Sequence, residues 1–432
     1  MEVEAEILVP VELQSVGALP RADELRRTLL PLAREKALLD SRDRARILKE
    51  HGLGSDVPLK DPNRTVSSFA LQIKYGQNTS FESFSCDPSK TKDGIGNIEE
   101  NPTVHGLQGL PDLEFRHLGS TFKELGKCMV DLGLCLARTC DKVIGGRELE
   151  QSILDSCSAK GRLIHYHSTM DNLILKEINR RSRAVTKKVR MVTHNSSSPR
   201  EPETSGNINF PEWKTAALDE QRKMENLSAD NCSKHRCRRT SFSNLWQQWH
   251  YDYGIFTILT PPLFISSAPM EDCTLGSRSQ PFSSPDGHTY LQLFDATENK
   301  ILVVKSPPGS FIVQVGEAAD ILSRGRLQST LHSVCRPVDF ENISRETFVV
   351  FLQPAWSKTL SHPRHLLNAK PIQGKLTPED ETSSKSQQLM QEILQKIPPL
   401  SSRLREGMTF AEFSRETTKQ YYGGSGTQSR DK

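Results

Sequence analysis

Residues 249–256 read WHYDYGIF and contain the two side chains on which the interpretation of the whole chain depends. If this stretch is a β-strand, His250 and Asp252 point to the same face, because side chains alternate between the two faces of a strand. An imidazole nitrogen and a carboxylate oxygen on one face are two potential ligands of a metal ion. The third is His332, at the end of a strand-like run in GRLQSTLHSV (325–334). Two histidines and one carboxylate describe the facial triad of non-haem Fe(II) sites. These three side chains are therefore candidate ligands of such a site.

Two other groups of residues offer metal ligands. A His-x-Asp pair alone is weak evidence, because this spacing often arises by chance. His165 and His167, in RLIHYH (162–167), have the same spacing and are either a metal-binding pair or two histidines on a solvated strand face. The stretch CSKHRC (232–237) offers softer ligands. A structural zinc ion needs four ligands and no matching second pair is nearby, which argues against zinc there.

The sequence around the predicted iron site consists of short strand-like runs separated by turns such as PDG (285–287) and PPG (307–309). Many short strands at near-regular spacing favour a sandwich or barrel over alternating strand–helix–strand units. The expected strands are Gly254–Leu259, Leu263–Ser266, Tyr290–Phe294, Lys300–Lys305, Ser310–Val315, Thr330–Val334 and Glu346–Leu352.

Helical patterns flank this region on its N-terminal side. Residues 120–143 place apolar side chains on one stripe, and Gly145 and Gly146 follow as a stop. Residues 21–48 also have a helical period, but Pro31 interrupts it, which predicts two short helices or a kinked one. Residues 61–101 are rich in Ser, Asn, Gly and Asp and are expected to form a loop.

Further helices are expected over residues 153–159 and 386–397, and a strand over residues 162–167. A last helix is expected to begin at Thr409, where Thr409 and Glu412 have the spacing of a capping box.

A polar segment separates residues 162–167 from the predicted iron pair. Between residues 176 and 240 there are 15 Lys and Arg against 8 Asp and Glu, with the basic runs RRSR (180–183) and KKVR (187–190). Few apolar residues recur with any period, so we expect a flexible insert over residues 180–245. The basic runs are either a nuclear-import or phosphate-contacting patch or a solvated loop.

Composition limits the functional classes. The chain has 432 residues with 56 Lys and Arg against 53 Asp and Glu, a net charge of +3 that argues against a dedicated nucleic-acid binder. No window approaches the ~20 apolar residues of a transmembrane helix. The first residues, MEVEAEILVP, lack the pattern of a secretory signal. Nine irregularly spaced cysteines fit reduced thiols. We therefore expect a cytoplasmic monomer without membrane contact, with a nuclear location as the alternative if the basic runs act as an import signal.

From residue 161 to about residue 356 the chain resembles the plant-type 2-oxoglutarate and Fe(II)-dependent oxygenases, the group similar to isopenicillin N synthase. HYDYGIFTIL (250–259) is similar to the metal-binding strand of that family. PPGSFIVQVGEAADILSRGRLQSTLHSV (307–334) resembles its run from a Pro-Gly turn to the distal histidine. RETFVVFLQP (345–354) resembles the strand that carries its Arg-x-Ser motif. The three motifs occur in the family's order, which makes the resemblance specific.

The resemblance implies an α+β protein with a double-stranded β-helix (jelly roll) core, flanked by N- and C-terminal helices. It implies that His250, Asp252 and His332 hold Fe(II), and that Arg345 binds the distal carboxylate of 2-oxoglutarate with help from the Thr347 hydroxyl. A guanidinium fork suits a carboxylate, and an i+2 hydroxyl shares its strand face. The alternatives are a surface arginine at a strand edge and an ordinary strand threonine.

The chain departs from the family at two motifs. Thr347 stands where the family has Ser, which keeps the hydroxyl. The family's Arg-x-Asn-x-Tyr motif corresponds to RLIHY (162–166) in this chain, with Ile164 in place of Asn. Tyr166 is kept, and it could still reach the co-substrate carboxylate. Trp246 and Trp249 either wall an apolar substrate pocket or belong to the core.

These observations divide the chain into five parts. We expect an N-terminal region of short elements (1–119), a helix and the first part of the oxygenase fold (120–179), the basic insert (180–245), the β-helix core (246–356) and a C-terminal helical extension (357–432). The expected function is an Fe(II)- and 2-oxoglutarate-dependent dioxygenase that hydroxylates or desaturates a small organic substrate with O2, giving succinate and CO2. The alternatives are a same-fold oxidase that does not use 2-oxoglutarate and a non-enzymatic interaction protein.

Overall fold

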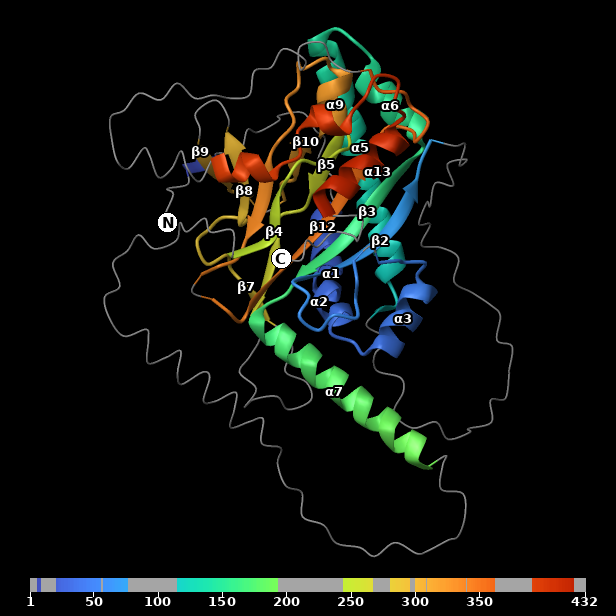
Figure 1. Ribbon diagram of the computed structural model, residues 1–432, viewed down its shortest axis with the longest axis vertical. Helices are drawn as coiled ribbons and strands as arrows, with labels where there is room; N and C mark the ends of the chain where they lie inside the picture. Colours follow the sequence, from blue (N-terminus) through green and yellow to red (C-terminus); the bar gives the residue numbers. More distant parts are fainter. Residues whose placement is uncertain are drawn as a thin grey trace, which may run out of the picture.

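Two mainly antiparallel β-sheets form the centre of the computed structural model (Figure 1). The structure describes residues 6–8, 21–55, 57–76, 115–192, 244–266, 280–295, 300–307, 309–338, 340–361 and 391–422. One sheet has the strand order β10-β5-β12-β3-β2, with β6 and β7 attached to β12. The other has the order β1-β9-β8-β11-β4. This arrangement confirms the expected α+β class with a jelly-roll core.

The larger sheet is organised around its longest strand, β12. This strand is paired with β3 on one side and with β5 and β6 on the other. Thr347 lies opposite Ile164 on β3, and Val349 lies opposite Leu259 on β5. The strands are β2 (Val66–Lys74), β3 (Ser158–Tyr166), β5 (Phe256–Leu259), β6 (Leu263–Ser266), β7 (Gln280–Phe282), β10 (Ile312–Val315) and β12 (Ile343–Leu352).

The smaller sheet places two of the predicted iron ligands side by side. Its strands β4 and β11 pair antiparallel, and His332 lies opposite His250 in that register. Strand β1 pairs parallel with β9 at the far edge. The strands are β1 (Glu6–Leu8), β4 (Leu245–His250), β8 (Leu291–Asp295), β9 (Lys300–Val304) and β11 (His332–Cys335).

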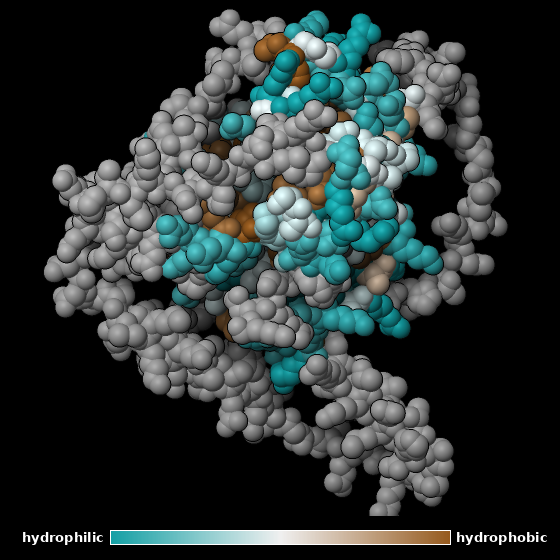
Figure 2. Space-filling view, turned by 45° about the horizontal axis from the view of Figure 1, so that its top comes forward, coloured by the Kyte–Doolittle hydropathy of each residue, from teal (hydrophilic) through white to brown (hydrophobic). Residues whose placement is uncertain are grey.

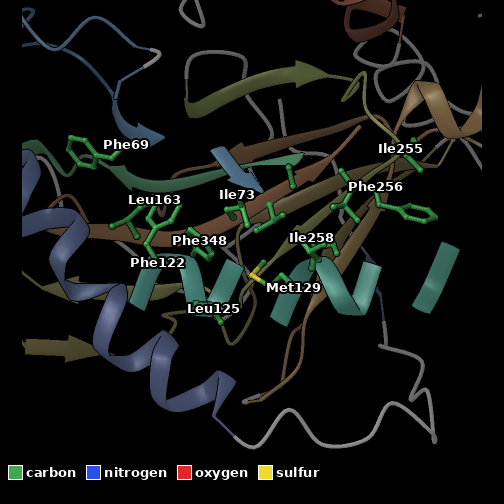
Figure 3. Close-up of a cluster of buried hydrophobic side chains, with 14 of the residues drawn as sticks. Phe69, Ile73, Phe122, Leu125, Met129, Leu163, Ile255, Phe256, Ile258 and Phe348 are labelled. Carbon is green, nitrogen blue, oxygen red and sulfur yellow. The ribbon is translucent and has the colours of Figure 1, made fainter. Parts of the chain in front are cut away.

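Helix α5 (Leu118–Ile144) covers the outer face of the larger sheet and forms the main core with it. Figure 3 shows its Phe122 and Met129 directed at the side chains of the sheet, among them Phe348. The rings of Phe122 and Phe348 have centroids 4.7 Å apart, in an edge-to-face arrangement. Each such fully buried apolar side chain contributes about 1.5–3 kcal/mol relative to an exposed one. This packing fixes the face of β12 that points away from the smaller sheet.

The remaining helices lie around this core. Arg403 on α12 forms a buried ion pair with Glu317 on α9, with Nη1 2.7 Å from Oε2. Helix α7 extends away from the sheets (Figure 1). Residues 391–396 are also helical. The helices are α1 (Ala22–Leu29), α2 (Pro31–Ala37), α3 (Ser41–Glu50), α6 (Glu148–Ser156), α7 (Thr169–Val192), α9 (Glu317–Leu322), α12 (Leu400–Arg403) and α13 (Phe410–Tyr422).

The expected capping box at the start of α13 is confirmed. The Thr409 amide donates to Glu412 Oε2 at 2.8 Å, and the Glu412 amide donates to Thr409 Oγ1 at 3.3 Å. The helix expected over residues 120–143 is α5, and the break expected at Pro31 is the start of α2.

Two predictions about irregular segments are wrong. Residues 66–74, expected to be loop, form β2, which pairs with β3 along its whole length. This strand is hard to recognise in the sequence VSSFALQIK, because Ser67 and Ser68 are polar and yet buried. The flexible insert was expected to begin at residue 180, but α7 continues to Val192. Residues 77–101 and 193–243 lie outside the described residues, and the division of the chain into five parts stays a prediction.

Among the described residues, no helix is both long enough and apolar enough to cross a membrane. On the face drawn in Figure 2, the described residues are mostly hydrophilic, with smaller hydrophobic areas between them. The large apolar side chains are instead gathered in three buried clusters, of which the largest joins α5 to the larger sheet.

Candidate metal and co-substrate site

The three predicted iron ligands converge in the structure. His250 and His332 face each other across β4 and β11, with ring centroids 4.2 Å apart. Asp252 Oδ1 lies 3.8 Å from His250 Nε2, and Asp252 Oδ2 lies 3.6 Å from His332 Nε2. One ligand atom from each residue lies within 4.8 Å of the other two, a spacing that a single metal ion can bridge.

Asp252 reaches this position by a different route from the one expected. Strand β4 ends at His250, so Asp252 lies in the turn that follows and not on the same strand face. Close backbone contacts shape this turn. The Glu317 amide donates to the Asp252 carbonyl at 2.8 Å, and a Cβ on Gly316 would lie 2.2 Å from the Gly254 carbonyl oxygen. The glycines let the two backbones approach closely enough to hold the Asp252 carboxylate beside the histidines.

Hydrogen bonds orient both imidazole rings. His250 Nδ1 donates to the Gln248 carbonyl at 2.8 Å, and His332 Nδ1 donates to the Thr330 carbonyl at 3.0 Å. Each Nε2 therefore carries the lone pair and points to the centre of the cluster. Metal-bound histidines in proteins are held in the same way through their second nitrogen.

The protonation states also suit a metal. Burial, reinforced by the neighbouring His332, lowers the pKa of His250 to about 4. Burial opposes ionisation of Asp252, but the two imidazoles outweigh it and hold the pKa of its carboxyl below the ordinary value. A neutral imidazole and an ionised carboxylate are the forms that bind a metal ion.

A cavity of about 240 Å³ opens beside the three ligands. Tyr166 lines it, and the Tyr166 hydroxyl donates to Gln247 Oε1 at 2.9 Å. Gln247 Nε2 lies 3.0 Å from His250 Nε2, so this amide occupies the lone pair that a metal would take. Gln314 also lines the cavity, and neither polar atom of its side chain has a hydrogen-bond partner within the described part of the chain.

Arg345 is buried beside this cavity, which makes the surface-arginine alternative wrong. Its guanidinium carbon lies 5.2 Å from the centre of the Tyr166 ring, and its Nε donates to the Thr289 carbonyl at 2.9 Å. Its Nη1 has no hydrogen-bond partner among the residues that the structure describes. Arg345 lies on the same face of β12 as Val349 and Phe351, which line the cavity.

Thr347 lies on the same face, but its hydroxyl already has a hydrogen-bond partner. It is buried, and its Oγ1 donates to the Thr260 carbonyl at 3.3 Å. Neither Arg345 nor Thr347 lines the cavity itself, whereas Ile164 does, at the place of the family's Asn.

The burial of four side chains decides between alternatives that the sequence left open. Trp246 and Trp249 are both buried and neither lines the cavity, so they belong to the core. His165 and His167 are also fully buried, which excludes the solvated strand face. The stretch 232–237 lies outside the described residues.

Sequence reasoning missed Gln247 and Gln314. Neither residue belongs to a recognisable motif, and only the pairing of β4 with β11 and of β10 with β5 brings them to the cavity. An available signal was the position of Gln247, three residues before His250 on a strand already suspected to bind metal.

A comparison with protein families matches residues 281–354 to the 2OG-Fe(II) oxygenase superfamily. No curated protein matches the chain. The segment 281–354 includes His332, Arg345 and Thr347.

Solved structures with a similar arrangement have low sequence identity. A full-length Neurospora crassa protein, in complex with alpha-KG and 5-formyluracil, is 13% identical, with a TM-score of 0.39, over 88% of this chain and 83% of that chain. JOX2, in complex with 2OG, Fe and JA, is 14% identical, with a TM-score of 0.40, over 95% and 84%. The dioxygenase for auxin oxidation of rice is 15% identical, with a TM-score of 0.40, over 91% and 86%.

Because these TM-scores are low, the assignment rests on the matched segment together with the jelly-roll fold. The segment supplies His332 on β11, whose partner strand β4 carries His250. Residues 281–354 therefore match the 2OG-Fe(II) oxygenase superfamily, whose members use Fe(II), 2-oxoglutarate and O2.

Proposed function

We propose that this chain is an Fe(II)- and 2-oxoglutarate-dependent dioxygenase that hydroxylates or desaturates a small organic substrate. The observation that carries the proposal is the buried Arg345, whose Nη1 has no hydrogen-bond partner in the described part of the chain. A buried donor without an acceptor destabilises the protein unless a ligand accepts a hydrogen bond from it. A carboxylate is the ligand that a guanidinium pairs with best.

The residues present fit both groups. His250, Asp252 and His332 would hold Fe(II) from one side and leave the cavity side open. Arg345 would bind the distal carboxylate of 2-oxoglutarate, with Tyr166 beside it. When bound, the iron supplies oxidation of a substrate C–H bond with O2, with succinate and CO2 formed from 2-oxoglutarate. The chain's own contribution is to orient the ligands, anchor the carboxylate and keep bulk water out.

Gln247 links the two halves of the site. In the structure its amide connects the Tyr166 hydroxyl to His250 Nε2. A metal ion takes the lone pair of that nitrogen, so the Gln247 amide must turn away from His250 when the metal binds. It remains next to Tyr166, where it can hydrogen-bond the co-substrate.

The cavity suits a small substrate. It has a volume of about 240 Å³ and is lined partly by aromatic side chains, including Tyr253, Phe351 and Tyr421. Apolar walls around a few polar groups are typical of small-molecule sites. The buried Arg345 favours this reading over an oxidase that does not use 2-oxoglutarate, and the converged ligands favour it over a non-enzymatic interaction protein. A cytoplasmic, monomeric state stays a prediction.

Succinate release tests the proposal directly. The full chain is incubated with Fe(II), 2-oxoglutarate, O2 and a metabolite extract, and succinate is measured against samples lacking each component. We expect release that requires Fe(II) and 2-oxoglutarate and rises with the extract. If the iron-loaded protein forms no succinate and anaerobic 2-oxoglutarate produces no charge-transfer absorbance, the proposal is wrong.

A further inference from the structure

A second cluster of potential metal ligands lies on the face of β3 and β12 that points away from the cavity. It consists of His165 on β3, His167 just after β3, and Asp171 in the first turn of α7. Each is at most 1% exposed, and one ligand atom from each lies within 4.8 Å of the other two. His165 Nε2 lies 3.5 Å from Asp171 Oδ2, close to the 3.6 Å between His332 Nε2 and Asp252 Oδ2 in the first cluster.

The outward atoms of these three side chains are all held by neighbours. His165 Nδ1 lies 2.8 Å from Glu346 Oε2, and His167 Nε2 lies 2.9 Å from Ser67 Oγ. Arg34 binds the carboxylate of Asp171, with its Nη2 2.8 Å from Oδ1. This is the arrangement that surrounds metal ligands, in which a carboxylate or hydroxyl fixes the second nitrogen of each histidine.

The inward nitrogens of the two histidines are left without such partners, whereas Asp171 Oδ2 accepts hydrogen bonds from the amide and the hydroxyl of Ser168. His165 Nε2 and His167 Nδ1 are buried and have no hydrogen-bond partner among the described residues. The rings that carry them meet edge to face, with centroids 4.2 Å apart. Two unsatisfied imidazole nitrogens at one buried point are costly. A metal ion would satisfy both nitrogens at once.

The charges around the cluster are balanced by pairing. Arg34 is bound to Asp171, and Arg64 donates to the carbonyls of Leu59, Asp61 and Ala37 and to Ser67 Oγ. Glu346 adds a second carboxylate beside His165. Burial, and then His165 and nearby arginines, keep the pKa of His167 well below its ordinary value.

We infer that His165, His167 and Asp171 form a second metal site, distinct from the iron site, which holds Zn2+ or a similar divalent transition metal through three protein ligands. Two imidazoles and one carboxylate are zinc ligands, and water can complete a four-coordinate ion. The site would tie β3 to the start of α7. Since Tyr166 lies between the two histidines and Arg345 precedes Glu346, the ion would also fix the strands that present the co-substrate residues.

The test uses the full chain with His332→Ala, which removes a ligand of the first cluster only. The protein is loaded with Zn2+, dialysed, and analysed by mass spectrometry of its metal content. We expect about one zinc ion per chain, and its loss when His167→Ala is added. Ser67→Ala keeps all three ligands and should weaken zinc binding about 10–100-fold. His288→Ala, a buried histidine outside both clusters, should leave zinc binding unchanged.

Folded His332→Ala protein that retains no zinc overturns the inference. That result would mean that contacts among the side chains of the cluster are enough to hold it together. If His332→Ala does not fold, the wild-type chain loaded with Fe(II) and Zn2+ decides. Two metal ions per chain support the second site, and a single ion overturns it. Failure of this test leaves the proposed dioxygenase activity untouched, because succinate release depends on the first cluster.

Discussion

Arg345 on β12 lies opposite Tyr166 on β3, and its guanidinium carbon is 5.2 Å from the centre of the Tyr166 ring. The next pair in the same register is Glu346 and His165, whose side chains are 2.8 Å apart. Because neighbouring residues on a strand face opposite sides, the first pair faces the cavity and the second faces the helices. The two ligand clusters therefore lie on opposite faces of one pair of strands.

The three candidate iron ligands give the first prediction. His250→Ala, Asp252→Ala and His332→Ala should each abolish Fe(II) binding and Fe(II)-dependent turnover, because three side chains are the minimum for this kind of site. Iron content and succinate release measure the effect. His288→Ala serves as the matched control and should retain both. Normal iron binding by any of the three ligand variants would contradict the assignment.

Replacement of Arg345 should affect the co-substrate and not the metal. A hydrogen bond to a charged group contributes roughly 1.5–3 kcal/mol, so Arg345→Ala should weaken 2-oxoglutarate binding about ten- to a hundred-fold. Arg345→Lys should recover only part of this, since an ammonium lacks the bidentate fork. Anaerobic titration of the Fe(II) protein, followed by its charge-transfer absorbance, gives the affinities. Equal affinity in Arg345→Ala and wild type would exclude Arg345 as the anchor.

The turn that carries Asp252 depends on Gly316. A Cβ at this position would lie 2.2 Å from the Gly254 carbonyl oxygen and 3.0 Å from the Asp252 carbonyl oxygen. These are backbone atoms, so Gly316→Ala should destabilise the protein by about 1–3 kcal/mol and lower its iron affinity. Thermal unfolding and iron titration measure the two effects. Gly146→Ala, where nothing lies within 4 Å of the added carbon, is the control and should be near neutral.

Lys36 gives a prediction about stability and pH. Its side chain is fully buried, its Nζ has no hydrogen-bond partner in the described part of the chain, and burial lowers its pKa from 10.5 to about 7. Between these two values the unfolded chain binds more protons than the folded protein, so this group makes the free energy of unfolding rise with pH.

Lys36→Met should therefore be more stable at pH 7, by about 1–3 kcal/mol, because it removes an unsatisfied buried donor. The difference should narrow as the pH rises through 10.5, because above that value the lysine becomes neutral in both states. Denaturant unfolding of both proteins across this range tests it. A stability difference that stays constant with pH would show that Lys36 titrates normally.

Some features of the protein follow from its sequence alone. The order and spacing of the motifs at residues 250–259, 307–334 and 345–354 indicate the fold, and the residue types within them are enough to single out His250, Asp252 and His332 as candidate ligands. These motifs are readable because metal ligation and carboxylate binding require particular side chains. The same holds for the capping box at Thr409 and Glu412, which is a local interaction.

Tertiary structure decided the rest. The sequence places Ser67 in a polar stretch, yet pairing of β2 with β3 buries it against His167. The RLIHYH run does not reveal that its histidines are buried, because burial depends on the packing of α2, β2 and β12 against β3. Asp252 reaches His250 and His332 through a turn shaped by Gly316, far away in the sequence. Local residue types specify the chemistry that a segment can perform, whereas long-range strand pairing and packing determine which side chains meet and which are removed from water.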